Sequence, residues 1–213
     1  MYNANVEDRG LILRGLTTFH SDSINAWTMV ILLALCIKYF LIQNTFPAFL
    51  FLLHACIHVP HSFKYHINYN FVNESIRTML IKNDMTYMFI SHILIHASLS
   101  STLPILISII SIPTYVLCTL LALRSIQKST TQRATKDASL NHAWLFLMHY
   151  FPLLYSRKWW QCAAHFGTFI VAFKTYKALD RRYQFGSREV SVGNACMHIG
   201  LLFNTLFGFK MIS

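Results

Sequence analysis

Long hydrophobic segments, separated by short polar or basic segments, constrain this chain more than any other feature of its sequence. A helix needs about 20 apolar residues to cross the hydrocarbon core of a bilayer. Seven segments of about that length cover residues 24–43, 46–66, 84–102, 105–123, 140–156, 159–177 and 190–210. Inside lipid, backbone hydrogen bonds must be satisfied within the protein, which favours helices. The seven segments therefore predict an all-α integral membrane protein with a seven-transmembrane helix bundle. Residues 1–213 are expected to form one membrane domain that begins with a cytosolic segment, 1–20. Between the spans we expect a polar loop at 68–83 and a solvated basic loop at 124–139. His149 is interpreted as an interface or packing residue.

The composition agrees with burial in lipid. Only 12% of the 213 residues are charged and 54% are hydrophobic, whereas a soluble domain carries about a quarter charged residues. A net charge of +10 in a soluble protein would suggest nucleic-acid binding. Here the basic residues lie between the hydrophobic segments, so we expect membrane lipids as partners and no nucleic acid.

The distribution of Lys and Arg predicts the orientation of the bundle. If the N-terminus is cytosolic, most of the 18 basic residues face the cytosol, and the outer side keeps Lys38, Arg157, Lys158 and Lys210. Because cytosolic loops are enriched in Lys and Arg, this asymmetry favours a cytosolic N-terminus and an outer C-terminus. That arrangement requires an odd number of spans, which agrees with seven.

Polar residues gather at the expected cytosolic ends of three helices. The second segment ends with Ser62 and His66, the third begins at Asp84, and the last begins with Asn194 and His198. Residues four apart share a helix face. Imidazoles and a carboxylate from separate helices suit a metal site or an acid–base site. The simpler alternative is that these residues anchor helix ends at the interface or bond between helices.

These residues resemble the motifs of the progestin and adipoQ receptor family, which includes the adiponectin receptors and the bacterial hemolysin III-like proteins. Residues 20–29 (HSDSINAWTM) are similar to the family pattern H-x-E-x-x-N-x-W-T-H, with Asp22 for Glu and Met29 for the last His. Residues 62–66 (SFKYH) are similar to S-x-x-[FY]-H, and Asp84 follows at the family's spacing. Residues 194–198 (NACMH) are similar to H-x-x-x-H.

The resemblance implies a zinc ion near the cytosolic face. Carried over to this sequence, His66 and His198 are zinc ligands, while Ser62 and Asp84 support the reaction at the bound water. The activity implied is zinc-dependent hydrolysis of a lipid amide or ester, such as a ceramide, with a sphingolipid or a fatty acid as the partner molecule.

Asn194 departs from the family pattern at the position of the remaining ligand. A carboxamide oxygen is a poor zinc donor compared with a neutral imidazole. The metal would then be bound more weakly, be completed by another His, or be lost. A chain without the metal would be a non-catalytic receptor or membrane-homeostasis protein.

Four further His residues form a possible second cluster deeper in the bundle. His54 and His58 are spaced i, i+4 on the second segment, and His92 and His96 are spaced likewise on the third. Counted from His66 and Asp84, the two pairs reach matching depths of about 12 and 18 Å at 1.5 Å per residue. If they face each other, they suit a proton path or a second metal site, and the chain would be a transporter or conductor. The alternative is hydrogen bonding between two helices, or His residues lining a wet lipid cavity.

Overall fold

The chain folds as a bundle of long helices, which confirms the all-α expectation. The computed structural model describes residues 22–212 except 70, 102, 156–158 and 183–187. The expected N-terminal segment 1–20, including His20 of the first motif, lies outside the described residues, as does Ser21. In chain order the elements are α2 (Ser23–Gln43), α3 (Phe46–Asn68), α4 (Glu74–Ser100), α5 (Ile105–Lys128), α6 (Gln132–Asn141), the 3-10 helix η1 (Ala143–His149), α7 (Tyr150–Tyr155), α8 (Trp159–Arg182) and α9 (Arg188–Ile212).

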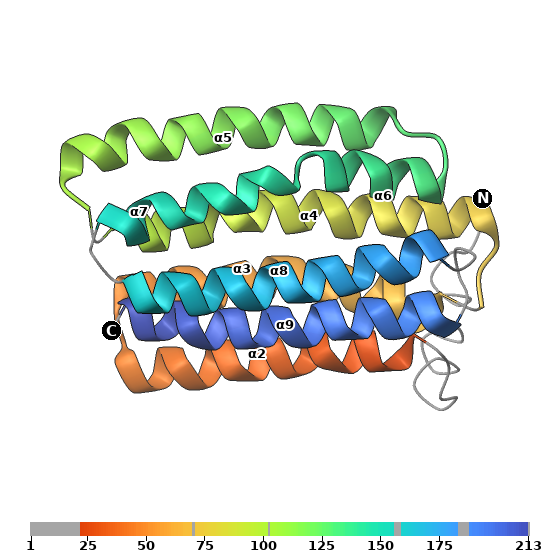
Figure 1. The fold of residues 1–213 in the computed structure, drawn as a ribbon, viewed down its shortest axis with the longest axis horizontal. Helices are drawn as coiled ribbons and strands as arrows, with labels where there is room; N and C mark the ends of the chain where they lie inside the picture. The colour runs from red at the N-terminus through yellow and green to blue at the C-terminus, as the bar shows by residue number, and fades with distance from the viewer. Residues whose placement is uncertain (1–21, 70, 102, 156–158, 183–187, 213) are drawn as a thin grey trace, which may run out of the picture.

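The long helices lie side by side, with α5 at one edge of the bundle and α2 at the other (Figure 1). A tight turn at Asn44 joins α2 to α3. Asn44 has the left-handed φ of 46°, which asparagine tolerates better than most residues, and its backbone N–H donates to the carbonyl of Phe40 at 2.8 Å. Thr45 then caps α3, and Pro47 lies in the first turn, where its missing N–H costs nothing.

Two helices begin earlier along the chain than the hydrophobic segments indicate. Residues 68–83 were expected to form a polar loop, but α4 starts at Glu74 because Asn73 Oδ1 accepts from the Ile76 N–H at 2.9 Å. Glu74 in the first turn also complements the helix dipole. Asp84 consequently lies well inside α4 and not at its start. Likewise, Thr131 caps α6 inside the expected basic loop.

The expected segment 140–156 is a composite of three short helices. The end of α6, η1 and α7 follow one another along the bundle (Figure 1). A 3-10 helix has fewer residues per turn than an α-helix, so η1 changes the directions of the side chains that follow it. The composite packs against α4 and α5, where Leu145 joins Phe89 and Tyr115 in a buried cluster.

Large apolar side chains cover the outside of the bundle. Ile105 on α5 is 77% exposed and Leu41 on α2 is 72% exposed. Among the described residues, α2, α3 and α5 are each long and apolar enough to cross a membrane. An apolar surface of this kind is unfavourable in water and favourable against lipid tails, which is consistent with a membrane protein.

Helices α8 and α9 pack closely through glycines. A Cβ added at Gly200 would lie 2.6 Å from the Cβ of Ala172, and one added at Gly193 would lie 2.9 Å from Leu179 Cδ1. Small residues at such positions let helix backbones approach each other, which is how many membrane helices associate. The space around Gly167 on α8 is open, with nothing within 4 Å of an added Cβ.

We expect Gly200→Ala to destabilise the protein by about 1–3 kcal/mol, because the new methyl group overpacks the contact with Ala172. The measurement is thermal unfolding of the purified protein in detergent. Gly167→Ala is the matched control and should leave the unfolding temperature unchanged or raise it, since alanine favours helix. Equal unfolding temperatures for the two variants would contradict the close packing of α8 on α9.

Candidate polar cavity

A cavity of about 180 Å³ lies between the helices of the bundle, lined by residues of α2, α3, α4, α6, η1, α8 and α9. Its lining is polar at some positions and apolar at others. The five residues singled out by the motif comparison all line it: Ser62, His66, Asp84, Asn194 and His198. Each is buried. Three helices therefore deliver polar side chains to one enclosed space.

The rings of His66 and His198 lie against each other in the cavity. Their ring centroids are 4.8 Å apart, and one ring meets the other edge-on. His66 belongs to the last turns of α3 and His198 to the first half of α9. Two imidazoles this close can share a bound ion, a water molecule or a substrate atom.

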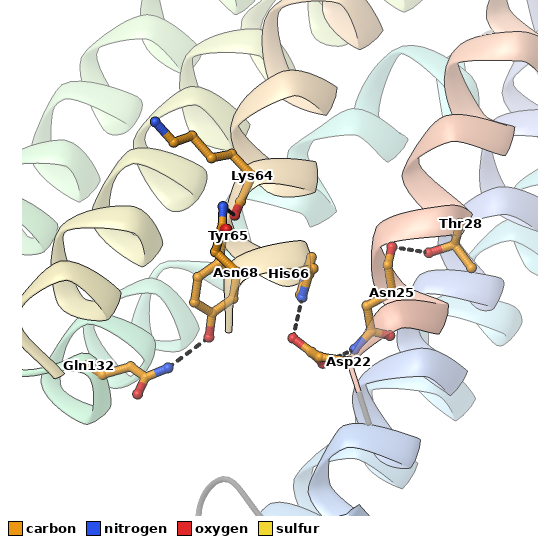
Figure 2. A network of polar contacts seen from close by, with 8 residues as sticks. All are labelled: Asp22, Asn25, Thr28, Lys64, Tyr65, His66, Asn68 and Gln132. Carbon is orange, nitrogen blue, oxygen red and sulfur yellow. Dashed lines mark hydrogen bonds and ion pairs between the residues drawn. The ribbon is translucent and has the colours of Figure 1, made fainter. Parts of the chain in front are cut away.

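Asp22 fixes the orientation of His66 (Figure 2). His66 Nδ1 donates to Asp22 Oδ2 at 2.7 Å, and Asn25 Nδ2 donates to the other carboxylate oxygen. Thr28 in turn donates to the backbone carbonyl of Asn25 at 2.7 Å. This bond turns Nε2 of His66 away from the carboxylate, so that in the neutral ring the lone pair of Nε2 is available.

Asp22 lies just before α2, and its surroundings shift the pKa of its carboxyl. Burial alone would raise its pKa, but the charge and the hydrogen bond of His66 outweigh burial and hold the pKa below its usual value. Asp22 was visible in the sequence only as a substitute for the family's Glu. Its partnership with His66 joins residues 44 positions apart, which no local spacing could indicate.

Asp84 pairs with a histidine outside the motif. His58 Nε2 and Asp84 Oδ1 are 3.1 Å apart, and both side chains are buried. Asp84 lines the cavity, and its direct partner is His58. The site contains two carboxylate–imidazole pairs.

Helix α6 covers one side of the cavity, although the sequence suggested a solvated basic connector there. Gln132 donates to the Tyr65 hydroxyl at 2.8 Å (Figure 2), and Lys136 lines the cavity with its ammonium 5.1 Å from the centre of the Tyr176 ring. The packed face of α6 carries three buried polar residues, Gln132, Thr135 and Ser139. Their spacing on one helix face is the sequence signal that could have indicated a packed helix.

The deeper histidines do not all meet as the sequence suggested. His54 lies between His58 and His92, with ring centroids 5.9 and 4.9 Å away. His96 instead turns toward α5, where Nε2 lies 2.7 Å from Ser111 Oγ. His149 was expected to be a packing residue. Its ring lies close to these histidines, with its centroid 5.6 Å from that of His92.

The donor set fits zinc only in part. Among the residues that the structure describes, no three His, Cys, Asp or Glu side chains form a group that could hold a metal ion. His66 and His198 supply two imidazoles, and a carboxylate on the distal nitrogen of His66 is typical of metal-bound histidines. His198 Nδ1 is buried with no hydrogen-bond partner within the described part of the chain. The donors at this place are two imidazoles and the carboxamide of Asn194, which lines the same cavity.

We expect Asp22→Asn to cost about 1–3 kcal/mol of stability at pH 7, because it replaces a charge-assisted hydrogen bond to buried His66. A carboxyl whose pKa is lowered by folding stabilises above its unfolded pKa of about 3.9 and loses that contribution as pH falls through the folded value. The difference from wild type, measured by thermal unfolding in detergent, should therefore shrink below about pH 4.

Asp137→Asn is the matched control for this substitution. Asp137 forms an exposed i, i+4 pair with Arg133 at 3.5 Å, and exposed pairs of this kind contribute about 0.5 kcal/mol or less. If both substitutions had the same small effect at pH 7, Asp22 would not hold His66 in the manner described.

The chain was compared with known proteins on three levels. Protein-family models, curated proteins and solved structures gave no match. The evidence on function is therefore the set of side chains that meet at the cavity and the spacing of the motifs that supply them.

Proposed function

We propose that the chain is a seven-span membrane protein of the progestin and adipoQ receptor type. The spans would be α2, α3, α4, α5, the composite of α6, η1 and α7, and then α8 and α9. The bundle arrangement and the three long apolar helices support this proposal. The distribution of Lys and Arg supports a cytosolic N-terminus and an outer C-terminus, which puts the cavity at the cytosolic end.

For the activity, we propose zinc-dependent hydrolysis of a lipid amide or ester, such as a ceramide. The observation that carries this proposal is the convergence of Ser62, His66, Asp84 and His198 on one cavity. Acyl hydrolysis needs a polarised carbonyl, an activated water and a group that handles the proton. A cavity with imidazoles and carboxylates at one end and apolar walls elsewhere offers these groups to a lipid.

Zinc, when bound by His66 and His198 with Asn194, would polarise the acyl carbonyl and acidify water. Asp22 accepts the hydrogen bond from His66 Nδ1 and so directs Nε2 of that ring toward a ligand. Asp84 can hold a proton at its carboxylate and share it with His58 Nε2. Met29, Leu32 and Phe51 provide an apolar wall that suits an acyl chain and excludes water.

One observation favours a second function. Asn194 lies at the position of a ligand and is buried on the cavity, so the metal affinity would be lower than that of three imidazoles. The alternative is a receptor or membrane-homeostasis protein that keeps the fold and binds a lipid without turning it over.

Metal content and hydrolysis of the same purified preparation distinguish the two functions. For the hydrolase we expect about one zinc ion per chain, lost in His198→Ala, and hydrolysis of ceramide in vesicles that falls about 10²–10⁴-fold in Asp84→Asn. His61→Ala is the control, because His61 stacks on Tyr87 and does not line the cavity.

The variant Asn194→His sharpens the comparison. It should raise zinc affinity in either case, because it supplies a third imidazole. Turnover by the wild-type protein would reject the non-catalytic alternative. Gently purified wild type without zinc and without turnover, alongside Asn194→His with zinc, would reject the hydrolase.

A further inference from the structure

A row of imidazole rings leads away from Asp84 into the middle of the bundle. Asp84 contacts His58 at 3.1 Å. The ring centroid of His54 is 5.9 Å from that of His58 and 4.9 Å from that of His92. All three rings line the cavity together with Asp84. Helices α3 and α4 each contribute two residues to this row.

The row continues beyond His92 toward α5. The ring of His149 lies 5.6 Å from His92 and 5.6 Å from His96, centre to centre. The Tyr115 hydroxyl is 3.2 Å from His149 Nε2, and His96 Nε2 is 2.7 Å from Ser111 Oγ. Each of these groups can both donate and accept a proton.

Serine hydroxyls extend the path between α4 and α5. Ser108, three residues before Ser111 on α5, donates to the backbone carbonyl of Ser100 at 2.8 Å. Ser100 itself is fully buried, and its Oγ has no hydrogen-bond partner in the described part of the chain. Further polar groups therefore lie beyond His96, as far as the last residue of α4.

The path is long enough to matter for a membrane. From Asp84 to Ser100 along α4 the rise is about 24 Å at 1.5 Å per residue, compared with about 30 Å for the hydrocarbon core. Buried histidines with a purely structural role would be expected to have their ring nitrogens hydrogen-bonded to neighbouring groups. Here the Nδ1 atoms of His54 and His96 are buried without partners among the described residues.

The hydrogen bonds set a usable tautomer at the centre of the row. His92 Nδ1 donates to the carbonyl of Met88 at 2.7 Å, which leaves a lone pair on Nε2. A neutral imidazole can accept a proton at one nitrogen and release one from the other. Ionisable residues inside membrane bundles commonly form such relays.

We propose that His58, His54, His92, His149 and His96, continued by the serines of α4 and α5, conduct protons through the bundle. In each step one proton leaves an N–H or O–H and joins the lone pair of the next group, directly or through one water molecule. No other bond changes, and the electrochemical gradient supplies the driving force. A second metal site is the less favoured use of these rings, because His96 bonds to Ser111 of α5 and does not face His54 and His92.

Proton flux into vesicles tests this proposal. The purified protein is reconstituted into liposomes that contain a pH-sensitive dye, and valinomycin with a potassium gradient drives protons inward. Wild type should acidify the vesicles severalfold faster than empty liposomes. His92→Asn keeps a donor for the Met88 carbonyl but cannot pass a proton, so its flux should fall to that of empty liposomes.

Two further variants make the result independent of folding defects. His54→Asn interrupts the row from the other helix and should abolish the flux as well, and His61→Asn, outside the cavity, should retain it. Wild-type flux equal to that of empty liposomes would overturn the proposal, and so would undiminished flux in both His92→Asn and His54→Asn. The flux is measured with a zinc chelator and without lipid substrate, so its presence or absence does not depend on hydrolysis.

Discussion

The hydrogen bonds Asp22–His66 and Asp84–His58 tie three helices together inside an apolar bundle. Asp22 precedes α2, both histidines belong to α3, and Asp84 belongs to α4. A lone carboxylate in such surroundings would be very costly, because burial removes its hydration. Each pair offsets that cost and fixes the rotation of one helix against the next. The same bonds determine which faces of α3 and α4 can line a cavity.

The pairing also organises the chemistry of the cavity. With Nδ1 of His66 occupied by Asp22, Nε2 is left for a ligand, and His198 of α9 approaches that ring to 4.8 Å between centroids. Asp84 and His58 then lie where two features meet. They border the proposed hydrolytic end on one side and begin the row of histidines on the other. One buried carboxylate could thus serve both a reacting water and a proton path.

The sequence predicted the helical membrane fold and brought Ser62, His66, Asp84, Asn194 and His198 into view, because hydrophobic length and i, i+4 spacing are local properties. It could not predict the partner of Asp84, since α4 begins at Glu74 and the phase of α3 against α4 depends on packing. His96 bonds to Ser111 for a related reason, because α5 packs against this part of α4. The contribution of Lys136 arises from the packing of α6, within a segment whose basic residues suggested solvent. That of His149 arises from η1, in a segment that was expected to be one continuous helix.

The coupling between Asp22 and His66 tests the central claim most directly. It is measured by a double-mutant cycle of Asp22→Asn and His66→Gln, with reversible unfolding followed in mixed detergent. Buried partners in one hydrogen-bonded pair should show an interaction free energy of about 1–3 kcal/mol. Substitution effects that add to within about 0.5 kcal/mol would contradict the account, because the two side chains would then not hold α2 and α3 together at the cavity.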